Sequence, residues 1–225
     1  MFEIRPNAGR CPYRLAWMPA LAVAVALSAA PAAARSRHQA PTTPGTYTDW
    51  NGEIDQVEIV GAWKLGDYRR VSVATFETSE VPLPEPGDNT YEPVKVMLAG
   101  VTAPFVAGLG QGLRKGIDVG GAEPAGASGA GSVSRDGPRT LLIRARVLTM
   151  DPGSRAARYW GGFGAGAART KVSGELVDAD SGAVLVRFTQ ERRSGFGIGG
   201  GGYVELMSRN LRTIGKDVAA FLNAF

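Results

Sequence analysis

The chain contains 225 residues, of which 25 are Lys or Arg and 21 are Asp or Glu, so its net charge at pH 7 is only +4. This balance argues against a nucleic-acid partner, which a strongly basic surface would favour. The single cysteine, Cys11, cannot form a disulfide within the chain, and the single histidine, His38, lies in a Pro- and Thr-rich stretch. We therefore expect no histidine- or thiol-dependent catalysis, no metal site and no cofactor.

The first 34 residues have the features of a secretory signal peptide. An apolar run, residues 15–30, follows three arginines and precedes the small residues Ala32, Ala33 and Ala34. We expect cleavage between Ala34 and Arg35, which leaves 191 residues with a net charge of +2 and no thiol. The protein is then exported, to the periplasm or the outer-membrane periphery of a bacterium.

Two other interpretations of this segment stay open. An uncleaved membrane anchor needs about 20 apolar residues, whereas this run has 16, contains Pro19 and is followed by Pro31. A lipoprotein needs a cysteine directly after the apolar run, and Cys11 precedes the run.

Residues 35–49 are rich in Pro, Thr and basic groups, and they predict a flexible spacer ahead of a single domain, residues 50–225. Apolar residues from Ile54 to Trp63 predict a first extended segment. Residues 68–76 then alternate, with Val71 and Val73 on one face, which predicts a strand.

A helix is expected over residues 91–114, where apolar residues recur at helical spacing: Val94, Met97 or Leu98, Val101, Phe105 and Leu109. Pro104 lies inside this pattern and predicts a kink or a break. A transmembrane reading of this segment is disfavoured by Glu92, Lys95 and the repeated glycines.

Residues 120–137 are mostly Gly, Ala and Ser and predict a mobile connection. Three strands are expected after it, over residues 140–148, 169–177 and 183–189. In the first of these strands Arg144 and Arg146 face solvent. The residues between the last two strands, 178–182, include Asp178, Asp180 and a glycine, and predict a tight hairpin turn.

The C-terminal segment has the clearest helical pattern, an apolar stripe of Val204, Met207, Leu211, Ile214, Val218 and Phe221. A stripe of this length favours a helix that covers a sheet over a partner-binding or coiled-coil seam. The predicted fold is therefore an α/β (α+β) two-layer sandwich. It has a mainly antiparallel sheet of four to five strands and two helices on one face.

Three glycine clusters, at residues 108–112, 161–166 and 195–202, raise the question of a phosphate-binding loop. None has the following Lys and Ser/Thr that such a loop needs, so nucleotide binding is not expected. Glu175, Asp178 and Asp180 are close enough in sequence to suggest an acid/base pair. They are better explained as an exposed strand residue and two turn residues, and no catalytic residue is assigned.

The second glycine cluster is flanked by basic and aromatic residues, a combination that suits binding of an acidic polymer, a lipid headgroup or a protein. The candidate binding residues are Arg155, Arg158, Tyr159, Trp160, Phe163 and Arg169. A solvated loop whose aromatics pack against the sheet is the alternative.

The segments Arg158–Arg169 and Val172–Leu185 resemble the bacterial envelope proteins grouped as domain of unknown function 4410. In that family an arginine and a glycine-rich turn precede a strand, an Asp-x-x-[Ser/Thr]-Gly hairpin and a C-terminal helix. The resemblance extends from about Tyr68 to the C-terminus. It implies an envelope location and brings no catalytic residues. Many members are lipoproteins, and this chain departs from them because no cysteine follows the apolar run.

The function we expect is that of a secreted, periplasmic, non-enzymatic binding or assembly module of the cell envelope. Its partner is another envelope protein or the membrane surface; no nucleic acid and no metal are expected, and the oligomeric state is left open. One alternative is a carboxylate-dependent hydrolase acting on envelope polymers. A second alternative is a membrane-associated oligomer assembled through the glycine-rich loops.

Overall fold

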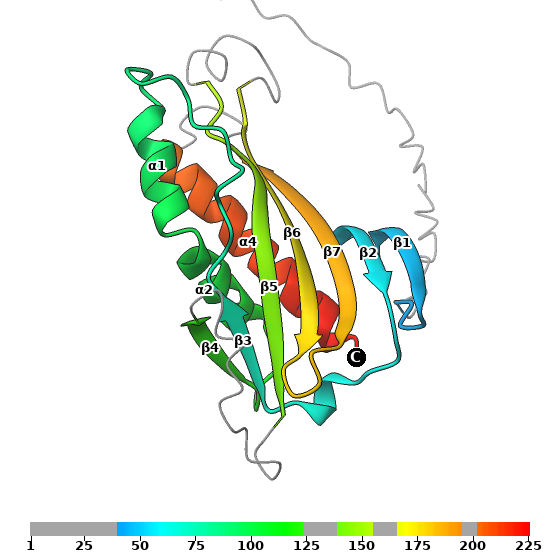
Figure 1. Cartoon of the computed structure of the whole chain (residues 1–225). Coiled ribbons are helices and arrows are strands. Elements are labelled where there is room, and N and C mark those ends of the chain that lie inside the picture. The colour runs from blue at the N-terminus through cyan, green and yellow to red at the C-terminus, as the bar shows by residue number, and fades with distance from the viewer. Residues whose placement is uncertain (1–39, 124–138, 155–165, 195–201) are drawn as a thin grey trace, which may run out of the picture. The chain divides into compact units, whose positions relative to one another are not determined.

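The computed structural model of the chain describes residues 40–123, 139–154, 166–194 and 202–225 (Figure 1). These residues form a seven-stranded sheet with the order β1-β2-β7-β6-β5-β3-β4, and the helices α1, α2 and α4 lie on one side of it. The expected two-layer arrangement of helices on one face of a sheet is confirmed. The expected numbers, four to five strands and two helices, are too low.

The bounds of the elements follow the apolar patterns of the chain. The strands are β1 Gly45–Trp50, β2 Ile54–Ile59, β3 Arg70–Ala74, β4 Asp118–Glu123, β5 Thr140–Asp151, β6 Ala168–Asp178 and β7 Val184–Ser194. The helices are α1 Tyr91–Ala99, α2 Thr102–Gly112 and α4 Tyr203–Asn223, with a short 3-10 helix, η1, at Leu65–Asp67.

The sheet is mainly antiparallel, as expected. β1, β2, β7, β6 and β5 pair antiparallel in that order, whereas β3 pairs parallel with both β5 and β4. Parallel neighbours need a crossover connection, and between β3 and β4 that connection contains α1 and α2.

The expected spacer, residues 35–49, is wrong from Gly45 onward, because β1 occupies Gly45–Trp50. Trp50 is buried, its indole Nε1 donates a hydrogen bond to the Pro41 carbonyl oxygen at 2.8 Å, and its ring packs edge-on against Phe221 at 4.8 Å. Burial of a large aromatic group outweighs the polar composition of this strand. The first extended segment is also shorter than expected, since β2 ends at Ile59 and not near Trp63.

Two further expectations are corrected between residues 91 and 123. The break expected within residues 91–114 is present, but it lies at Gly100 and Val101 and divides the segment into α1 and α2. Pro104 itself lies in the first turn of α2, where a missing N–H does no damage. The connection expected from residue 120 begins later, because β4 extends to Glu123 beside β3. The helical face itself is confirmed: Val94, Met97, Val101, Phe105 and Leu109 are buried.

Helix α4 buries the predicted stripe against the sheet. Met207, Leu211, Ile214, Val218 and Phe221 are all at most 3% exposed. Val204 is the exception, since it is 40% exposed and Leu206 is buried in its place. Each large apolar side chain buried in this way contributes about 1.5–3 kcal/mol relative to an exposed position, so α4 is a principal part of the core.

The first glycine cluster serves helix packing. A Cβ on Gly108 would overlap the carbonyl oxygen of Arg212, and one on Gly112 would lie 2.8 Å from the Cβ of Ala219. On the facing helix, a Cβ on Gly215 would overlap the carbonyl oxygen of Phe105. These glycines therefore allow α2 and α4 to approach closely.

In the described part of the chain, no helix by itself has the length and apolar composition of a membrane span. The pair α1 and α2 meets both criteria together but is bent by 58° at its break.

Candidate functional site

One face of the sheet is covered by α1, α2 and α4, and no helix among the described residues covers the other, which we call the open face (Figure 1). A groove of about 1050 Å³ lies on this face, lined by residues of β2, β7, β6, β5 and β3. Alternation along the strands explains its polar character, because the strands direct most of their apolar residues to the helices and most of their polar residues away from them.

A row of alternating charges crosses the groove from β2 to β5. Glu58, Arg187, Glu175 and Arg144 are successive Cα partners across the four strands. The Arg187 guanidinium donates to Glu58 Oε2 and to Glu175 Oε1, both at 3.1 Å. All three side chains of this pairing are more than a third exposed, so the pairing contributes little to stability.

Arg144, at the end of that row, has no carboxylate within 4.0 Å among the described residues, because Arg187 occupies Glu175. Arg146 lies two positions further along β5 and donates through Nε to Ser173 Oγ at 3.3 Å. In the parts of the chain that the structure describes, Arg146 and Arg70 on β3 also lack an ion-pair partner. These three arginines line the β5 and β3 side of the groove.

Of the residues predicted to bind a partner, only Arg169 falls within the described ranges. It lies on β6, on the open face, in register with Asp151 and Arg193, and its Nε is 3.5 Å from Glu191 Oε1. Arg155, Arg158, Tyr159, Trp160 and Phe163 lie outside the described residues, as do Ala34 and Arg35 at the expected cleavage site.

The described residues on either side of this predicted loop are held close together. The Ser154 N–H donates to the Gly166 carbonyl oxygen at 3.2 Å, and a Cβ on Gly153 would overlap that oxygen. Gly153 also has a φ of +69°, which favours glycine. Ala168, the first residue of β6, pairs with Ser194, the last residue of β7. The strand that follows residues 155–165 therefore begins next to the strand end that precedes residues 195–201.

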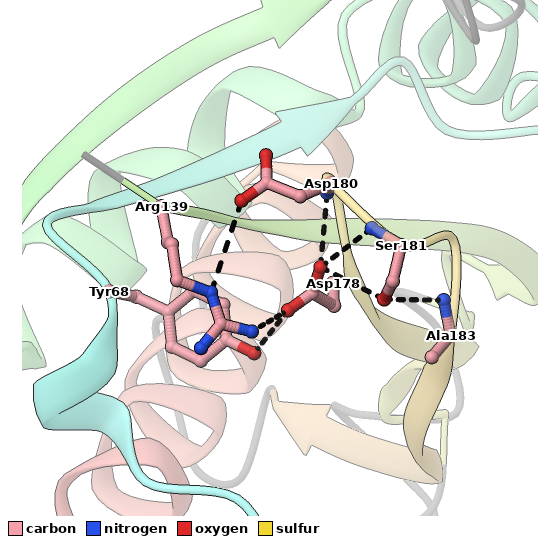
Figure 2. Close-up of polar contacts among 6 residues, drawn as sticks. All are labelled: Tyr68, Arg139, Asp178, Asp180, Ser181 and Ala183. Carbon is pink, nitrogen blue, oxygen red and sulfur yellow. Dashed lines mark hydrogen bonds and ion pairs between the residues drawn. The ribbon is translucent and has the colours of Figure 1, made fainter. Parts of the chain in front are cut away.

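A second polar cluster lies at the opposite end of β5 and β6, around Asp178 (Figure 2). Asp178 Oδ1 accepts hydrogen bonds from the Asp180 N–H at 3.0 Å, the Ser181 N–H at 2.9 Å and the Ser181 hydroxyl at 3.0 Å. The predicted tight turn is therefore confirmed, and Gly182 follows it with a φ of +73°. Figure 2 shows that the same carboxylate also faces Tyr68 and Arg139.

Asp178 Oδ2 accepts the Tyr68 hydroxyl at 2.8 Å and pairs with the Arg139 guanidinium, which also stacks over the Tyr68 ring at 4.9 Å. Burial of Asp178 opposes ionisation, but the hydrogen bonds from Ser181, Tyr68 and Arg139 outweigh it and lower the pKa of this carboxyl to about 2. Burial and the neighbouring carboxylate raise the pKa of Tyr68. Asp178 is thus ionised and Tyr68 neutral at physiological pH.

This geometry argues against Glu175 and Asp178 as an acid/base pair. Glu175 lies on the open face, whereas Asp178 is buried on the other side of β6 with five donors around it. A carboxylate with a pKa near 2 does not act as a general acid at neutral pH.

The membrane-associated oligomer depends on glycine-rich loops that fall mostly outside the described residues.

The sequence did not identify Tyr68 or Arg139. These residues lie 110 and 39 positions away from Asp178 in the chain, and no local pattern indicates that they contact it. The sequence did place Arg144 and Arg146 on a solvent face, but it did not show that they line one groove with Arg70 and Arg187. In the described ranges, no group of three or more His, Cys, Asp or Glu residues is arranged to hold a metal ion.

No curated protein matches the chain. Among solved structures, similarity is found to the PelC dodecamer from Paraburkholderia phytofirmans, with 16% identity, a TM-score of 0.41, and coverage of 72% of this chain and 96% of that chain. The hypothetical protein CT253 from Chlamydia trachomatis has 11% identity, a TM-score of 0.41, and coverage of 69% and 99%. Lipoprotein GNA1162 from Neisseria meningitidis has 16% identity, a TM-score of 0.29, and coverage of 69% and 94%.

The family resemblance is tested directly by comparison with family models. One segment of the chain matches a family model. It contains Arg139, the three arginines of β5 and β7 that line the groove, and the Asp178 hairpin. It is shorter than the expected range, which began at Tyr68. Residues 130–197 match the family described as "Domain of unknown function (DUF4410)", and the resemblance to that family is confirmed.

Proposed function

We propose that this protein is a non-enzymatic binding or assembly module of the bacterial cell envelope that contacts its partner through the open face of the sheet. The groove of about 1050 Å³ carries this proposal, because it is a hollow polar surface opposite the helical layer. Of the arginines that line the groove, Arg187 pairs with carboxylates. The others have no carboxylate partner among the described residues, so their guanidinium groups are available to a ligand.

The proposal includes export. In this proposal residues 1–34 are the signal peptide and cleavage falls between Ala34 and Arg35. The match of residues 130–197 to DUF4410, a family that we associate with the bacterial envelope, supports a periplasmic or outer-membrane location. N-terminal sequencing of the protein from each cell fraction tests this step. We expect Arg35 as the first residue, and recovery of the intact leader from the membrane fraction would contradict cleavage.

The loop that precedes β6 is the second part of the proposed binding surface. Its candidate residues are Arg155, Arg158, Tyr159, Trp160, Phe163 and Arg169. Arg169 supports this assignment because it lies on the open face, on the same strand as Ser173 and Glu175 of the groove. Aromatic and arginine side chains are the groups that most often dominate protein interfaces.

Affinity capture from envelope extracts tests the module as a whole. The exported protein is compared with Arg158→Ala/Trp160→Ala and with Arg212→Ala, a control on the exposed side of α4. We expect the control to recover the same component as the parent and the double variant to lose it. Equal recovery by all three proteins would remove the loop from the proposal, and recovery of nothing by the parent protein would contradict the proposed function.

A further inference from the structure

We infer that the open-face groove binds a carboxylate-bearing polysaccharide, with Arg144 and Arg146 as its principal contacts. This inference rests on the proposed function and adds the chemical class of the ligand. It is carried by the distribution of charge in the groove and by the kind of side chain between the charges.

Charge is distributed unevenly across the groove. Its charged lining consists of four arginines and three glutamates, and Arg187 engages two of those glutamates, Glu58 and Glu175. On the β5 and β3 side, the groove is lined by Arg70, Arg144 and Arg146. Two lining carboxylates lie next to this side: Glu77, which is the bridge partner of Arg146, and Glu175, which is the Cα partner of Arg144 and is already paired with Arg187. No ion pair joins Glu77 to any of these arginines within the described residues. This side of the groove therefore attracts anions.

Neutral hydrogen-bonding groups continue the row that contains Arg146. Gln56, Thr189 and Ser173 are successive Cα partners across β2, β7 and β6, and Ser173 is the partner of Arg146 on β5. Hydroxyl and amide side chains both donate and accept hydrogen bonds, as sugar hydroxyls require. An arginine fork beside them matches a carboxylate.

Other anionic partners fit this surface less well. A planar membrane surface does not enter a hollow, and the glutamates of the groove oppose the dense phosphates of a nucleic acid. A protein partner requires apolar anchor pockets. The groove offers little of this kind: Phe188 of β7 is 6% exposed and its ring lies against Gly174, and Leu142 of β5 is only partly exposed.

The test is a binding titration with polygalacturonate as the carboxylated glycan and dextran as the neutral one. The exported protein is compared with Arg144→Gln/Arg146→Gln and with Arg212→Gln, a control on the exposed side of α4 that is outside the groove. We expect the parent and the control to bind polygalacturonate and not dextran, and the double variant to bind at least about tenfold more weakly. Binding should also weaken as the ionic strength rises from about 0.01 M to about 0.15 M.

Each outcome bears on the inference. Equal affinity of the double variant, or equal binding of dextran, would overturn it, as would a complete lack of polygalacturonate binding. Since Arg144 and Arg146 are exposed, an unchanged thermal unfolding curve of the double variant is expected and excludes misfolding as the cause of a loss. If the parent captures an envelope protein but binds no glycan, the inference fails and the proposed module stands.

Discussion

The hydroxyl of Tyr68 donates a hydrogen bond to Asp178 Oδ2 at 2.8 Å, although 110 positions separate these residues in the chain. Tyr68 follows η1 and precedes β3, whereas Asp178 ends β6 and begins the turn to β7. The contact therefore joins the parallel part of the sheet to its antiparallel part. Arg139, immediately before β5, completes the cluster by pairing with the same carboxylate oxygen.

We predict that Asp178→Asn lowers the free energy of unfolding by about 2–3 kcal/mol, because hydrogen bonds to a charged acceptor are lost and an amide N–H₂ faces other donors. Urea unfolding monitored by circular dichroism measures this change. Asp180→Asn is the matched control, since Asp180 is partly exposed and 3.9 Å from Arg139. Its effect should stay below about 0.5 kcal/mol; equal losses for the two variants would contradict a special role of Asp178.

The same carboxylate predicts a dependence of stability on pH. Its pKa is about 2 in the folded protein and near 3.8 normally, so its contribution is present above pH 4 and is lost as the pH falls towards 2. A shift of this size corresponds to about 2 kcal/mol. The stability difference between the parent and Asp178→Asn should shrink over this interval, as measured by urea unfolding at each pH. A difference that stays constant would show that ionisation of Asp178 does not stabilise the fold.

Helix packing gives a prediction with an internal control. Gly108→Ala should destabilise the protein by about 1–3 kcal/mol, because its Cβ would overlap the Arg212 carbonyl oxygen on α4. Gly110→Ala lies on the same helix but meets only Val119 at 4.0 Å, so it should stabilise the protein by about 0.5–1 kcal/mol. Thermal unfolding of the two variants measures both changes. Equal destabilisation by the two variants would contradict the role of the close contact between Gly108 and Arg212.

The elements that the sequence predicts well are those in which the apolar pattern continues without interruption over many residues. α4 and β5 each bury one face over many residues, and their patterns predict both the element and the buried side. β6 is predicted correctly as a strand. β4 was missed because its glycines contribute no apolar pattern, and it forms through its parallel pairing with β3. Tertiary context overrides local preference in such short strands.

β1 did carry a local signal that composition concealed. Asn51 and Gly52 follow it with φ angles of 52° and 73°, and Asn-Gly between two extended segments is typical of a tight hairpin turn. The polar Thr and Asp residues of β1 favoured a spacer, whereas its pairing with β2 and the burial of Trp50 hold it in the sheet.

The polar clusters could be predicted only in part. Asp178 was correctly placed in a turn from its neighbours, but its contacts with Tyr68 and Arg139 arise when η1, β5 and the β6–β7 turn meet. In the same way, alternation on β5 predicts that Arg144 faces solvent. Only the strand order places Glu175 between Arg144 and Arg187, and because Glu175 pairs with Arg187, Arg144 has no ion-pair partner among the described residues.

Glu175→Gln tests the charge balance of the groove by removing a negative charge, whereas Arg144→Gln/Arg146→Gln removes positive charges. This change removes a carboxylate from the centre of the row, leaving Arg187 with Glu58 alone and Arg144 without a neighbouring negative charge. If the groove binds a carboxylated glycan, affinity for polygalacturonate should rise about two- to fivefold, the scale of one exposed ion pair. Glu205→Gln is the control, because it removes an exposed carboxylate paired with an arginine on α4, outside the groove, and it should leave the affinity unchanged. Weaker binding by Glu175→Gln would mean that Glu175 supports the bound ligand through its contact with Arg187, and that Arg187 must then be counted among the contacts to the ligand.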